Sequence, residues 1–388
     1  MIYQTPAMTE ADLAVLERLE ELRSNLRFFL KEPRRWFGTL RRATMARAVQ
    51  GSNSIEGYHA SVEDVAAVLD DEEPLGTDEE TRQAIAGYRD AMTYLLQAAG
   101  DERPVDESLL KSLHFMMMKY DLSKHPGLWR PGAVWVEDEA GRTVYTAPDR
   151  DLVVPLISEL LAEVAGKEGP FLVQAAMAHL NLTMIHPFSD GNGRMARCLQ
   201  SLILARGGNI SPEFLSIEEY LGRNTRSYYE VLAGIAQGEW RPNASARPWI
   251  KYCLTAHYRQ AHTLLRRVGE TEALWDRCEQ LAHRRRVPAR SVAVLCDAAR
   301  GWRLRRSLYL KRVSGATGEV ITDATATRDL RSLVDAGLLL PEGERRGRQY
   351  HPTPELSRVW LEIRQARTVT GVQDPYESLV PELPGLLA

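Results

Sequence analysis

A histidine, a carboxylate, two glycines and two arginines stand close together in the stretch HPFSDGNGRMAR, which runs from His186 to Arg197. Pro187 disfavours helical geometry at His186, so the preceding helix should end there and the next helix should start near Gly193. The N-terminus of a helix offers free N–H groups and partial positive charge, and both suit an anion. The stretch is therefore expected to be a helix–loop–helix turn that can bind phosphate.

The residue types in this turn fit phosphoryl or nucleotidyl transfer. The two glycines allow positive φ and an amide nest around a phosphate, and the two arginines can add charge-assisted contacts. Asp190 can hold a magnesium ion that bridges phosphate oxygens. His186, on the rim, can take a proton from an incoming hydroxyl group. The combination indicates a transferase site.

Two other interpretations of the same residues are weaker. Each glycine, histidine or arginine taken singly has an ordinary structural explanation, such as a turn or a solvated side chain. His179, His186 and Asp190 could also be ligands of a structural metal. The combination of all the features favours the transferase site over both.

The stretch resembles the signature of the Fic family, HPFx(D/E)GNGRxxR, at every defined position. Family members with the complete signature generally transfer AMP from ATP to a hydroxyl side chain of a target protein, so the resemblance implies ATP and Mg²⁺. Doc-type kinases of the same superfamily carry a lysine in the glycine–asparagine–glycine core, which this chain keeps intact, and adenylylation is therefore favoured over phosphorylation. By resemblance, His186 is the general base and Asp190 is the magnesium ligand. The implied nucleotide- and phosphate-binding residues are Pro187, Phe188, Gly191, Asn192, Gly193, Arg194 and Arg197.

A second Fic pattern, (S/T)xxxE(G/N), is matched by GSNSIEGY at Ser52, Glu56 and Gly57. The spacing places Ser52 and Glu56 on one face of a helix, and Gly57 suits the C-terminal stop. By resemblance, Glu56 pairs with Arg197 and keeps ATP from a productive pose, which makes the protein self-inhibited. In some family members the same glutamate supports removal of AMP, so a bifunctional or AMP-removing enzyme is an alternative.

The resemblance to the family covers about residues 34–258 and adds two expectations. Two short β-like runs around a turn glycine predict a hairpin at residues 133–147. It is similar to the family's flap, which holds the target segment by strand addition. EEYLGRNTRSYYEVL is similar to the segment that helps to enclose the nucleotide base, so Asn224 and Tyr229 are candidate base or ribose contacts, with a helix cap and a core aromatic as the structural alternatives. The expected partner is a target protein that docks on this hairpin, and the protein could also modify itself.

The C-terminal part of the chain is basic. Residues 284–351 hold 15 Lys or Arg against 7 Asp or Glu, although the whole chain carries a net charge of −3. Three short helical units precede two apolar runs around a Gly- and Arg-rich turn, which resembles the winged-helix module found at the C-terminus of many Fic proteins. The second helix is expected at residues 324–336 and the wing tip at residues 342–348. This module would bind duplex DNA or a protein, and a nucleotide-sensing DNA-binding regulator is a further alternative.

The composition indicates a mainly α protein. The resemblance to the family implies a Fic-type helical core with a β-hairpin flap, followed by a small winged helix-turn-helix-like domain. We expect an N-terminal helical region at 1–75 with the inhibitory helix, the catalytic core at 76–265, the winged module at 270–355 and a tail at 356–388. The four separate cysteines favour a reducing compartment, and no apolar run approaches the roughly 20 residues that span a bilayer. We therefore predict a cytoplasmic protein without a membrane partner, and we also expect a homodimer.

Overall fold

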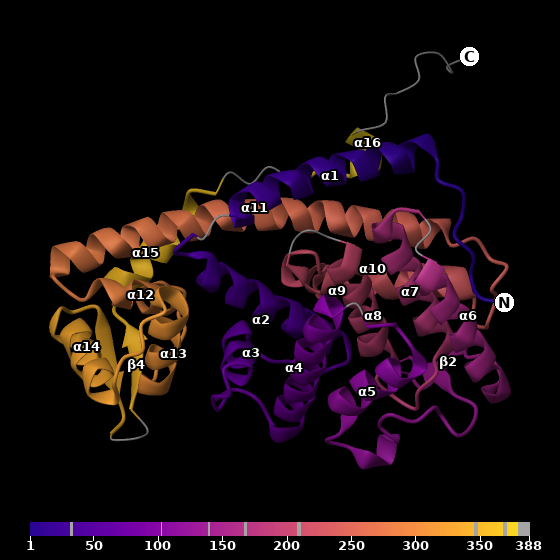
Figure 1. Ribbon diagram of the computed structural model, residues 1–388, viewed down its shortest axis with the longest axis horizontal. Coiled ribbons are helices and arrows are strands. Elements are labelled where there is room, and N and C mark those ends of the chain that lie inside the picture. Colours follow the sequence, from indigo (N-terminus) through magenta and orange to yellow (C-terminus); the bar gives the residue numbers. More distant parts are fainter. Residues whose placement is uncertain are drawn as a thin grey trace. The chain divides into compact units, whose positions relative to one another are not determined.

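The computed structural model describes residues 1–31, 34–101, 103–138, 140–166, 169–207, 211–344, 348–367 and 371–378. The described chain is mainly helical, with two short antiparallel hairpins (Figure 1). The mainly α fold class with a β-hairpin is thus confirmed. The chain divides into two compact units, the first comprising Met1–Ser24, Met45–His262 and Val372–Ala388, and the second comprising Asn25–Thr44 and Thr263–Gly371.

The first unit is built around helix α7 (Phe171–Ile185), which packs along α8 (Asn192–Gly207). Almost every α7 side chain is buried, as expected for a helix that is apolar on all sides. Helices α1 (Glu10–Lys31), α2 (Phe37–Ile55) and α11 (Arg247–Arg285) contribute residues to both units. The remaining elements of the first unit are α3 (Val62–Leu69), α4 (Glu79–Gly100), α5 (Glu107–Met118), η1 (Leu122–Lys124), η2 (Arg150–Leu152), α6 (Val153–Gly166), η3 (Pro212–Phe214), α9 (Glu218–Arg223), α10 (Thr225–Ala236) and α16 (Pro375–Ser378).

The hairpin of the first unit consists of β1 (Trp135–Glu137) and β2 (Thr143–Thr146), within the range that the sequence predicted. Tyr145 faces inward, and its hydroxyl donates to the carbonyl of Met184 at 2.6 Å, near the end of α7. On the outer edge of β2, the N–H of Thr146 donates to the carbonyl of Gly238 at 2.9 Å. Among the described residues, β1 pairs with no strand other than β2, so its outer edge is open.

Helices α2 and α9 approach each other closely at a pair of glycines. A Cβ atom on Gly222 would lie 2.5 Å from the Cα of Gly51, and one on Gly51 would lie 2.4 Å from the carbonyl oxygen of Glu218. Only glycine fits at such a crossing, because any side chain would push the backbones apart. The contact fixes the C-terminal half of α2 against the helical segment at residues 218–236.

The second unit contains a 3-10 helix and three short α-helices, which are followed by a hairpin. They are η4 (Ala289–Ser291), α12 (Val292–Ala299), α13 (Arg306–Thr317), α14 (Asp323–Asp335), β3 (Leu339–Glu342) and β4 (Gln349–Pro352), after which α15 (Pro354–Gln365) lies in the segment that we expected to be a tail. The Asp297 carboxylate is buried between the guanidinium groups of Arg312, at 2.7 Å, and Arg42, at 3.2 Å. This pairing joins residues from distant parts of the sequence and keeps the pKa of Asp297 below its usual value despite the burial.

Among the helices that the structure describes, none combines the length and the apolar character needed to cross a bilayer.

Candidate active site

The loop between α7 and α8 is shaped by two left-handed residues. Helix α7 ends at Ile185, and His186 follows it with φ 53° while its N–H still donates to the carbonyl of Leu182 at 3.1 Å. Gly191 has φ +75°, and a Cβ atom there would lie 3.0 Å from the sulfur of Met118. Helix α8 then starts at Asn192. The predicted helix–loop–helix turn is therefore present at the expected residues.

Phe188 and Asn192 hold this loop together. The Asn192 amide accepts from the Phe188 N–H and donates to the Phe188 carbonyl, both at 2.9 Å. The Phe188 ring is fully buried and stacks on His114, with ring centroids 3.7 Å apart. The side chains of Phe188 and Asn192 thus make contacts that stabilise the loop. Binding of phosphate by these two residues or by Pro187 stays a prediction.

The tautomer of His186 is set by a backbone contact. Its Nδ1 lies 3.1 Å from the carbonyl oxygen of Thr183, so Nδ1 carries the proton and Nε2 keeps a lone pair. Burial lowers the pKa of His186, and the positive charge of Arg130 adds to this effect. A neutral imidazole with a free Nε2 can accept a proton at neutral pH.

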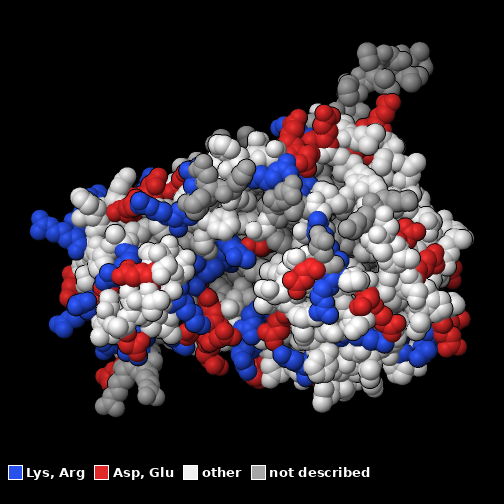
Figure 2. All heavy atoms as spheres, viewed as in Figure 1, with Lys and Arg blue, Asp and Glu red and all other residues white. Residues whose placement is uncertain are grey.

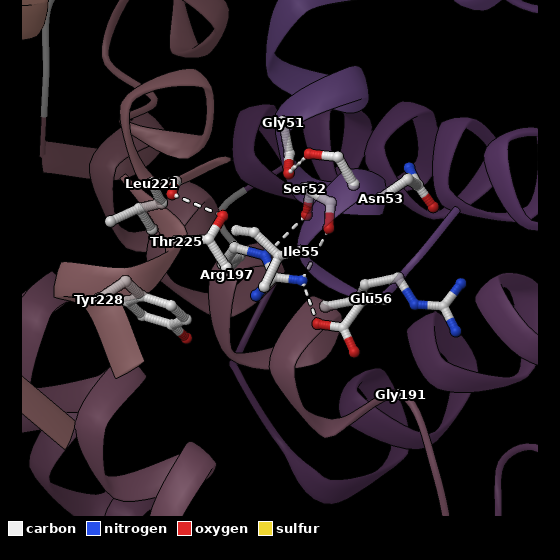
Figure 3. Close-up of polar contacts among 12 residues, drawn as sticks. Gly51, Ser52, Asn53, Ile55, Glu56, Gly191, Arg197, Leu221, Thr225 and Tyr228 are labelled. Atoms are coloured by element: carbon white, nitrogen blue, oxygen red, sulfur yellow. Dashed lines mark hydrogen bonds and ion pairs between the residues drawn. The ribbon is translucent and has the colours of Figure 1, made fainter. Parts of the chain in front are cut away.

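The predicted contact between Glu56 and Arg197 is present (Figure 3). Arg197 Nη2 lies 2.6 Å from Glu56 Oε1 and 3.0 Å from the Ser52 carbonyl, and Arg197 Nε donates to the Ser52 hydroxyl at 2.7 Å. The Arg197 side chain is fully buried, whereas that of Glu56 is 21% exposed. A Cβ atom on Gly193 would lie 2.5 Å from Glu56 Oε1, so the carboxylate occupies the space above the first turn of α8.

The end of α2 directs Glu56 toward this position. The N–H of Tyr58 donates to the carbonyl of Asn53 at 3.1 Å, and the N–H of Gly57 donates to that of Ser54 at 3.2 Å. Gly57 has φ +87°, so the set of contacts is a Schellman motif with Glu56 at the C-cap. The glycine of the second sequence pattern is thus needed for the turn that follows the glutamate.

Arg194 is buried beside aromatic and sulfur groups. Its Nη2 lies 2.9 Å from the Met118 sulfur and 3.5 Å from the Tyr120 hydroxyl, and its guanidinium carbon lies 5.1 Å from the centre of the Tyr58 ring. Among the described residues, Arg194 Nε and Nη1 have no hydrogen-bond partner, and both atoms are buried. Arg197 Nη1 is likewise buried and has no hydrogen-bond partner among the described residues.

Asp190 lies at the rim of the site, with its side chain 37% exposed. One carboxylate oxygen accepts from the N–H of Gly191 at 2.6 Å, and the other lies 3.5 Å from Lys124 Nζ. In the part of the chain that the structure describes, no three His, Cys, Asp or Glu side chains converge as a metal-binding group. His179, the third residue of the structural metal interpretation, instead hydrogen-bonds to Gln200 and Tyr228.

Asn224 and Tyr229 lie on the α9–α10 segment. Helix α9 ends at Arg223 and α10 begins at Thr225, so the segment is two helices with a break between them. Asn224 lies between them, and its side-chain amide donates to the carbonyl of Tyr220 at 2.8 Å. The Tyr229 hydroxyl donates to the carbonyl of Ile55 at 3.2 Å, so this half-exposed tyrosine lies beside the end of α2. Base or ribose contacts for the two residues stay a prediction.

Three residues that the sequence did not single out also organise the site. Arg130 is fully buried, and its Nε donates to the carbonyl of His186 at 2.9 Å. His114 accepts from the N–H of Gly127 and donates from Nε2 to the carbonyl of Asp190 at 3.0 Å. Burial lowers the pKa of His114 to about 4, so its ring is neutral. Arg130 and His114 leave no pattern in the sequence, because each binds the carbonyl of a residue far away along the chain. The third residue is Tyr58, whose ring lies against Arg194.

Residues 104–204 match the profile of the Fic/DOC family. The protein adenylyltransferase fic-1 of Caenorhabditis briggsae is 43% identical over 70 residues, which are 18% of this chain and 12% of that protein. The protein adenylyltransferase Fic of Nematostella vectensis is 41% identical over 68 residues, which are 18% of this chain and 14% of that protein. The chain thus matches about an eighth of the length of these curated relatives.

Two solved structures have the same fold. A Fic family protein from Desulfovibrio desulfuricans aligns with a TM-score of 0.58 at 23% identity, over 91% of this chain and 99% of that chain. A fragment of Fic-1 from Caenorhabditis elegans aligns with a TM-score of 0.51 at 20% identity, over 67% of this chain and 73% of that chain. At these identities the likeness concerns the fold alone.

Proposed function

This chain is a Fic family protein with its Fic/DOC domain at residues 104–204, and from this premise we propose that it is a protein adenylyltransferase. It transfers AMP from ATP to the hydroxyl group of a tyrosine, threonine or serine of a target protein. In the ground state the protein inhibits itself through Glu56. Relatives that are named protein adenylyltransferases support this activity.

The observation that carries the proposal is the set of buried guanidinium N–H groups on the first turns of α8. Arg194 Nε and Nη1 and Arg197 Nη1 are buried without a hydrogen-bond partner among the described residues. A buried donor left unsatisfied costs about 1–3 kcal/mol, so a ligand that supplies acceptors is strongly favoured here. Phosphate oxygens are suitable acceptors for guanidinium groups, and the N-terminus of α8 adds partial positive charge.

His186 is the proposed base of the reaction. The target hydroxyl gives its proton to the free Nε2, and its oxygen forms a bond to the α-phosphorus of ATP. The bond between the α-phosphorus and the bridging oxygen breaks, and pyrophosphate leaves. The hydrogen bond from Nδ1 to the Thr183 carbonyl keeps the ring in the required tautomer throughout.

Asp190 would hold the magnesium ion. Mg²⁺ is usually bound by one or two carboxylates together with substrate phosphates, and a half-exposed carboxylate beside a phosphate site fits that donor set. When bound, the ion neutralises phosphate charge. The Lys124 ammonium at 3.5 Å balances the Asp190 carboxylate from within the chain.

The target segment is proposed to add to the open outer edge of β1. An exposed strand edge offers unpaired N–H and C=O groups to a second strand, and such pairing holds an extended segment in a defined register. The hairpin is tied to the catalytic loop, because Tyr145 of β2 hydrogen-bonds to Met184, two residues before His186. A segment of the same protein could occupy this edge, which would give self-modification.

Glu56 is proposed to act as the brake. Its carboxylate engages Arg197 Nη2 and lies over Gly193, where a phosphate of ATP would have to lie to use the same guanidinium group. ATP would then bind in a pose that does not expose its α-phosphorus to the target. Removing the carboxylate should free both the arginine and this space.

We expect Glu56→Gly to raise the rate of AMP incorporation by about 10-fold or more. The variant lacks the charged hydrogen bond between Glu56 and Arg197, which is worth about 1.5–3 kcal/mol, so Arg197 is free to bind phosphate. The measurement is intact-mass analysis of the protein after incubation with ATP and Mg²⁺, with and without candidate target protein. Glu56→Gln is the matched variant. It keeps the side-chain volume without the charge and should lie between wild type and Glu56→Gly.

The mass gain separates the alternatives. One AMP unit supports adenylyl transfer, a phosphate would indicate a kinase, and no gain at any target would contradict the proposal. Equal incorporation by wild type and Glu56→Gly would exclude the brake. Loss of a preformed AMP unit from a modified target in the wild-type protein alone would indicate an AMP-removing enzyme.

DNA binding by the second unit is a second proposed function. The order of α12, α13, α14 and the β3–β4 hairpin supports a winged-helix module, and α14 carries the exposed residues Thr327, Arg328 and Arg331. Figure 2 shows Lys and Arg side chains projecting at the edge of the view where Figure 1 places α14 and the end of α11, although both signs of charge are mixed over the face in view. Of the three predicted wing-tip arginines, Arg345 and Arg346 lie outside the described residues.

If α14 contacts duplex DNA, the double variant Arg328→Ala and Arg331→Ala should weaken binding and lower the slope of log affinity against log salt by about 2, one unit for each lost phosphate contact. The measurement is a mobility-shift titration at several salt concentrations. Arg364→Ala, on the exposed side of α15, is the control and should leave the slope unchanged. Absence of any salt-dependent shift in the wild type would instead support a protein-binding module.

Two further proposals concern the assembly and the location of the protein. A homodimer would present two copies of α14. The burial of all four cysteines as free thiols supports a cytoplasmic location.

A further inference from the structure

Arg194 and Arg197 are both contacted by one short segment of the chain, Ser52 to Tyr58. We propose that Tyr58 is a positioning residue that holds Arg194 ready for a phosphate, so that this segment contacts both arginines of the motif. The inference rests on the proposed function, because the ligand of Arg194 is taken to be the polyphosphate of ATP. Neither sequence pattern of the family includes position 58.

The contacts around Arg194 form a closed set. The Tyr58 ring lies against the guanidinium group, with 5.1 Å between the ring centre and the guanidinium carbon. The Tyr58 hydroxyl lies 3.0 Å from the Tyr120 hydroxyl, which in turn lies 3.5 Å from Arg194 Nη2. The Met118 sulfur lies 2.9 Å from Arg194 Nη2 and is the remaining contact of this set.

This arrangement leaves the guanidinium donors free. Arg194 is 1% exposed. The Glu56 carboxylate acts on it electrostatically, but among the described residues no carboxylate forms an ion pair with it. An aromatic face stabilises a cation through its quadrupole without accepting a hydrogen bond from every N–H. Tyr58 therefore offsets part of the desolvation of the charge while Nε and Nη1 stay available. A carboxylate in its place would satisfy the same groups and compete with phosphate.

The position of Tyr58 is linked to the end of α2. The Schellman contact from the Tyr58 N–H to the Asn53 carbonyl, at 3.1 Å, fixes the backbone just beyond Gly57. This contact does not involve the Glu56 side chain. The variant Glu56→Gly should consequently lose the contact with Arg197 and keep Tyr58 against Arg194, so a released brake and an ordered Arg194 are compatible.

The test uses the full-length chain with two substitutions, Glu56→Gly, which frees Arg197, and His186→Ala, which prevents turnover. The affinity of this parent for ATP in the presence of Mg²⁺ is measured by calorimetry. Tyr58→Leu in this parent should weaken the Kd for ATP by about 5- to 30-fold, the equivalent of a buried cation–π contact. Tyr58→Phe keeps the ring and should stay within about twofold of the parent. Adenosine, which has no phosphate, should bind all three proteins equally. An unchanged ATP affinity in Tyr58→Leu, or an equal loss in Tyr58→Phe, overturns the proposal.

A second measurement does not depend on nucleotide binding. In protein labelled with ¹⁵N arginine, the Nε–H signal of Arg194, assigned with Arg194→Lys, should show an aromatic ring-current shift in the parent and in Tyr58→Phe that is lost in Tyr58→Leu. If the parent binds no ATP, the proposed function fails, and this signal still decides the role of Tyr58. A signal that does not respond to Tyr58→Leu overturns the proposal.

Discussion

Replacing His186 in the Glu56→Gly chain is expected to lower the rate of AMP transfer by about 10²–10⁴-fold, the contribution typical of a positioned general base. The reason is the free Nε2, which no alanine or asparagine can supply. The rate is measured as AMP incorporated per unit time, by intact mass, at saturating ATP. His59→Ala, which removes an exposed histidine, is the control and should leave the rate unchanged.

The choice of substitution separates chemistry from folding. His186 has φ 53°, a conformation that costs roughly 1–2 kcal/mol for most residues but is tolerated by asparagine. His186→Asn should therefore be as inactive as His186→Ala while unfolding at a higher urea concentration. If His186→Asn kept activity within a few fold of its parent, His186 would not be the base.

The pH profile gives a third criterion with a defined sign. Burial lowers the pKa of His186 from its usual value of about 6.5, so the neutral, proton-accepting form persists below that pH. The transfer rate should stay level from about pH 8 down to about pH 6.5 and fall only at lower pH, as the imidazole takes up a proton. A rate that declines already between pH 8 and pH 7 would point to a different base.

The sequence predicted those features that depend on neighbouring residues. The end of α7 before Pro187, the start of α8 beside the glycines and the hairpin at residues 133–147 follow from local rules of backbone geometry. The pairing of Glu56 with Arg197, 141 positions apart, came from the resemblance to a family and not from periodicity or composition. The inhibitory role proposed for this contact is tested by the Glu56→Gly variant.

Other features depend on the fold and had no local signal. The Gly51–Gly222 crossing, the break at Asn224 and the Asp297 ion pairs involve partners that only the tertiary structure brings together. Tyr58 is one residue beyond the glycine of the second pattern, and its importance becomes visible only when Arg194 is seen against its ring. A side chain that serves a distant guanidinium group or carbonyl leaves no periodic mark in the sequence.

Arg130 is the strongest example of such a residue, and its removal should have a large effect on stability. It is 0% exposed and donates to three carbonyl groups, those of His186, Gly132 and Pro148. Its own N–H also donates to the carbonyl of Pro187 at 2.9 Å. One side chain thus joins the ends of the hairpin segment, at Gly132 and Pro148, to the loop that begins at His186.

Arg130→Met is expected to lower the free energy of unfolding by about 3 kcal/mol or more, because hydrogen bonds to a charged group are worth about 1.5–3 kcal/mol each and the buried carbonyls would lose their donor. The measurement is urea unfolding followed by circular dichroism. Arg130→Lys is the matched variant. A lysine keeps the charge but cannot reproduce the planar fork that reaches three acceptors, so it should recover only part of the loss.

The same variant should also separate the two roles of the loop. In the proposed site, nucleotide affinity depends mainly on the arginines of α8. Arg130 does not contact them, so the affinity of folded Arg130→Lys for ATP should stay close to that of its parent. In the proposed reaction, transfer depends on the position of His186 relative to the hairpin at which the target is proposed to bind, and Arg130 connects these two parts through His186 and Gly132. In the Glu56→Gly background, Arg130→Lys should therefore reduce the transfer rate by about 10-fold or more at unchanged ATP affinity. A loss of ATP affinity that matched the loss of rate would place the role of Arg130 in the phosphate site instead.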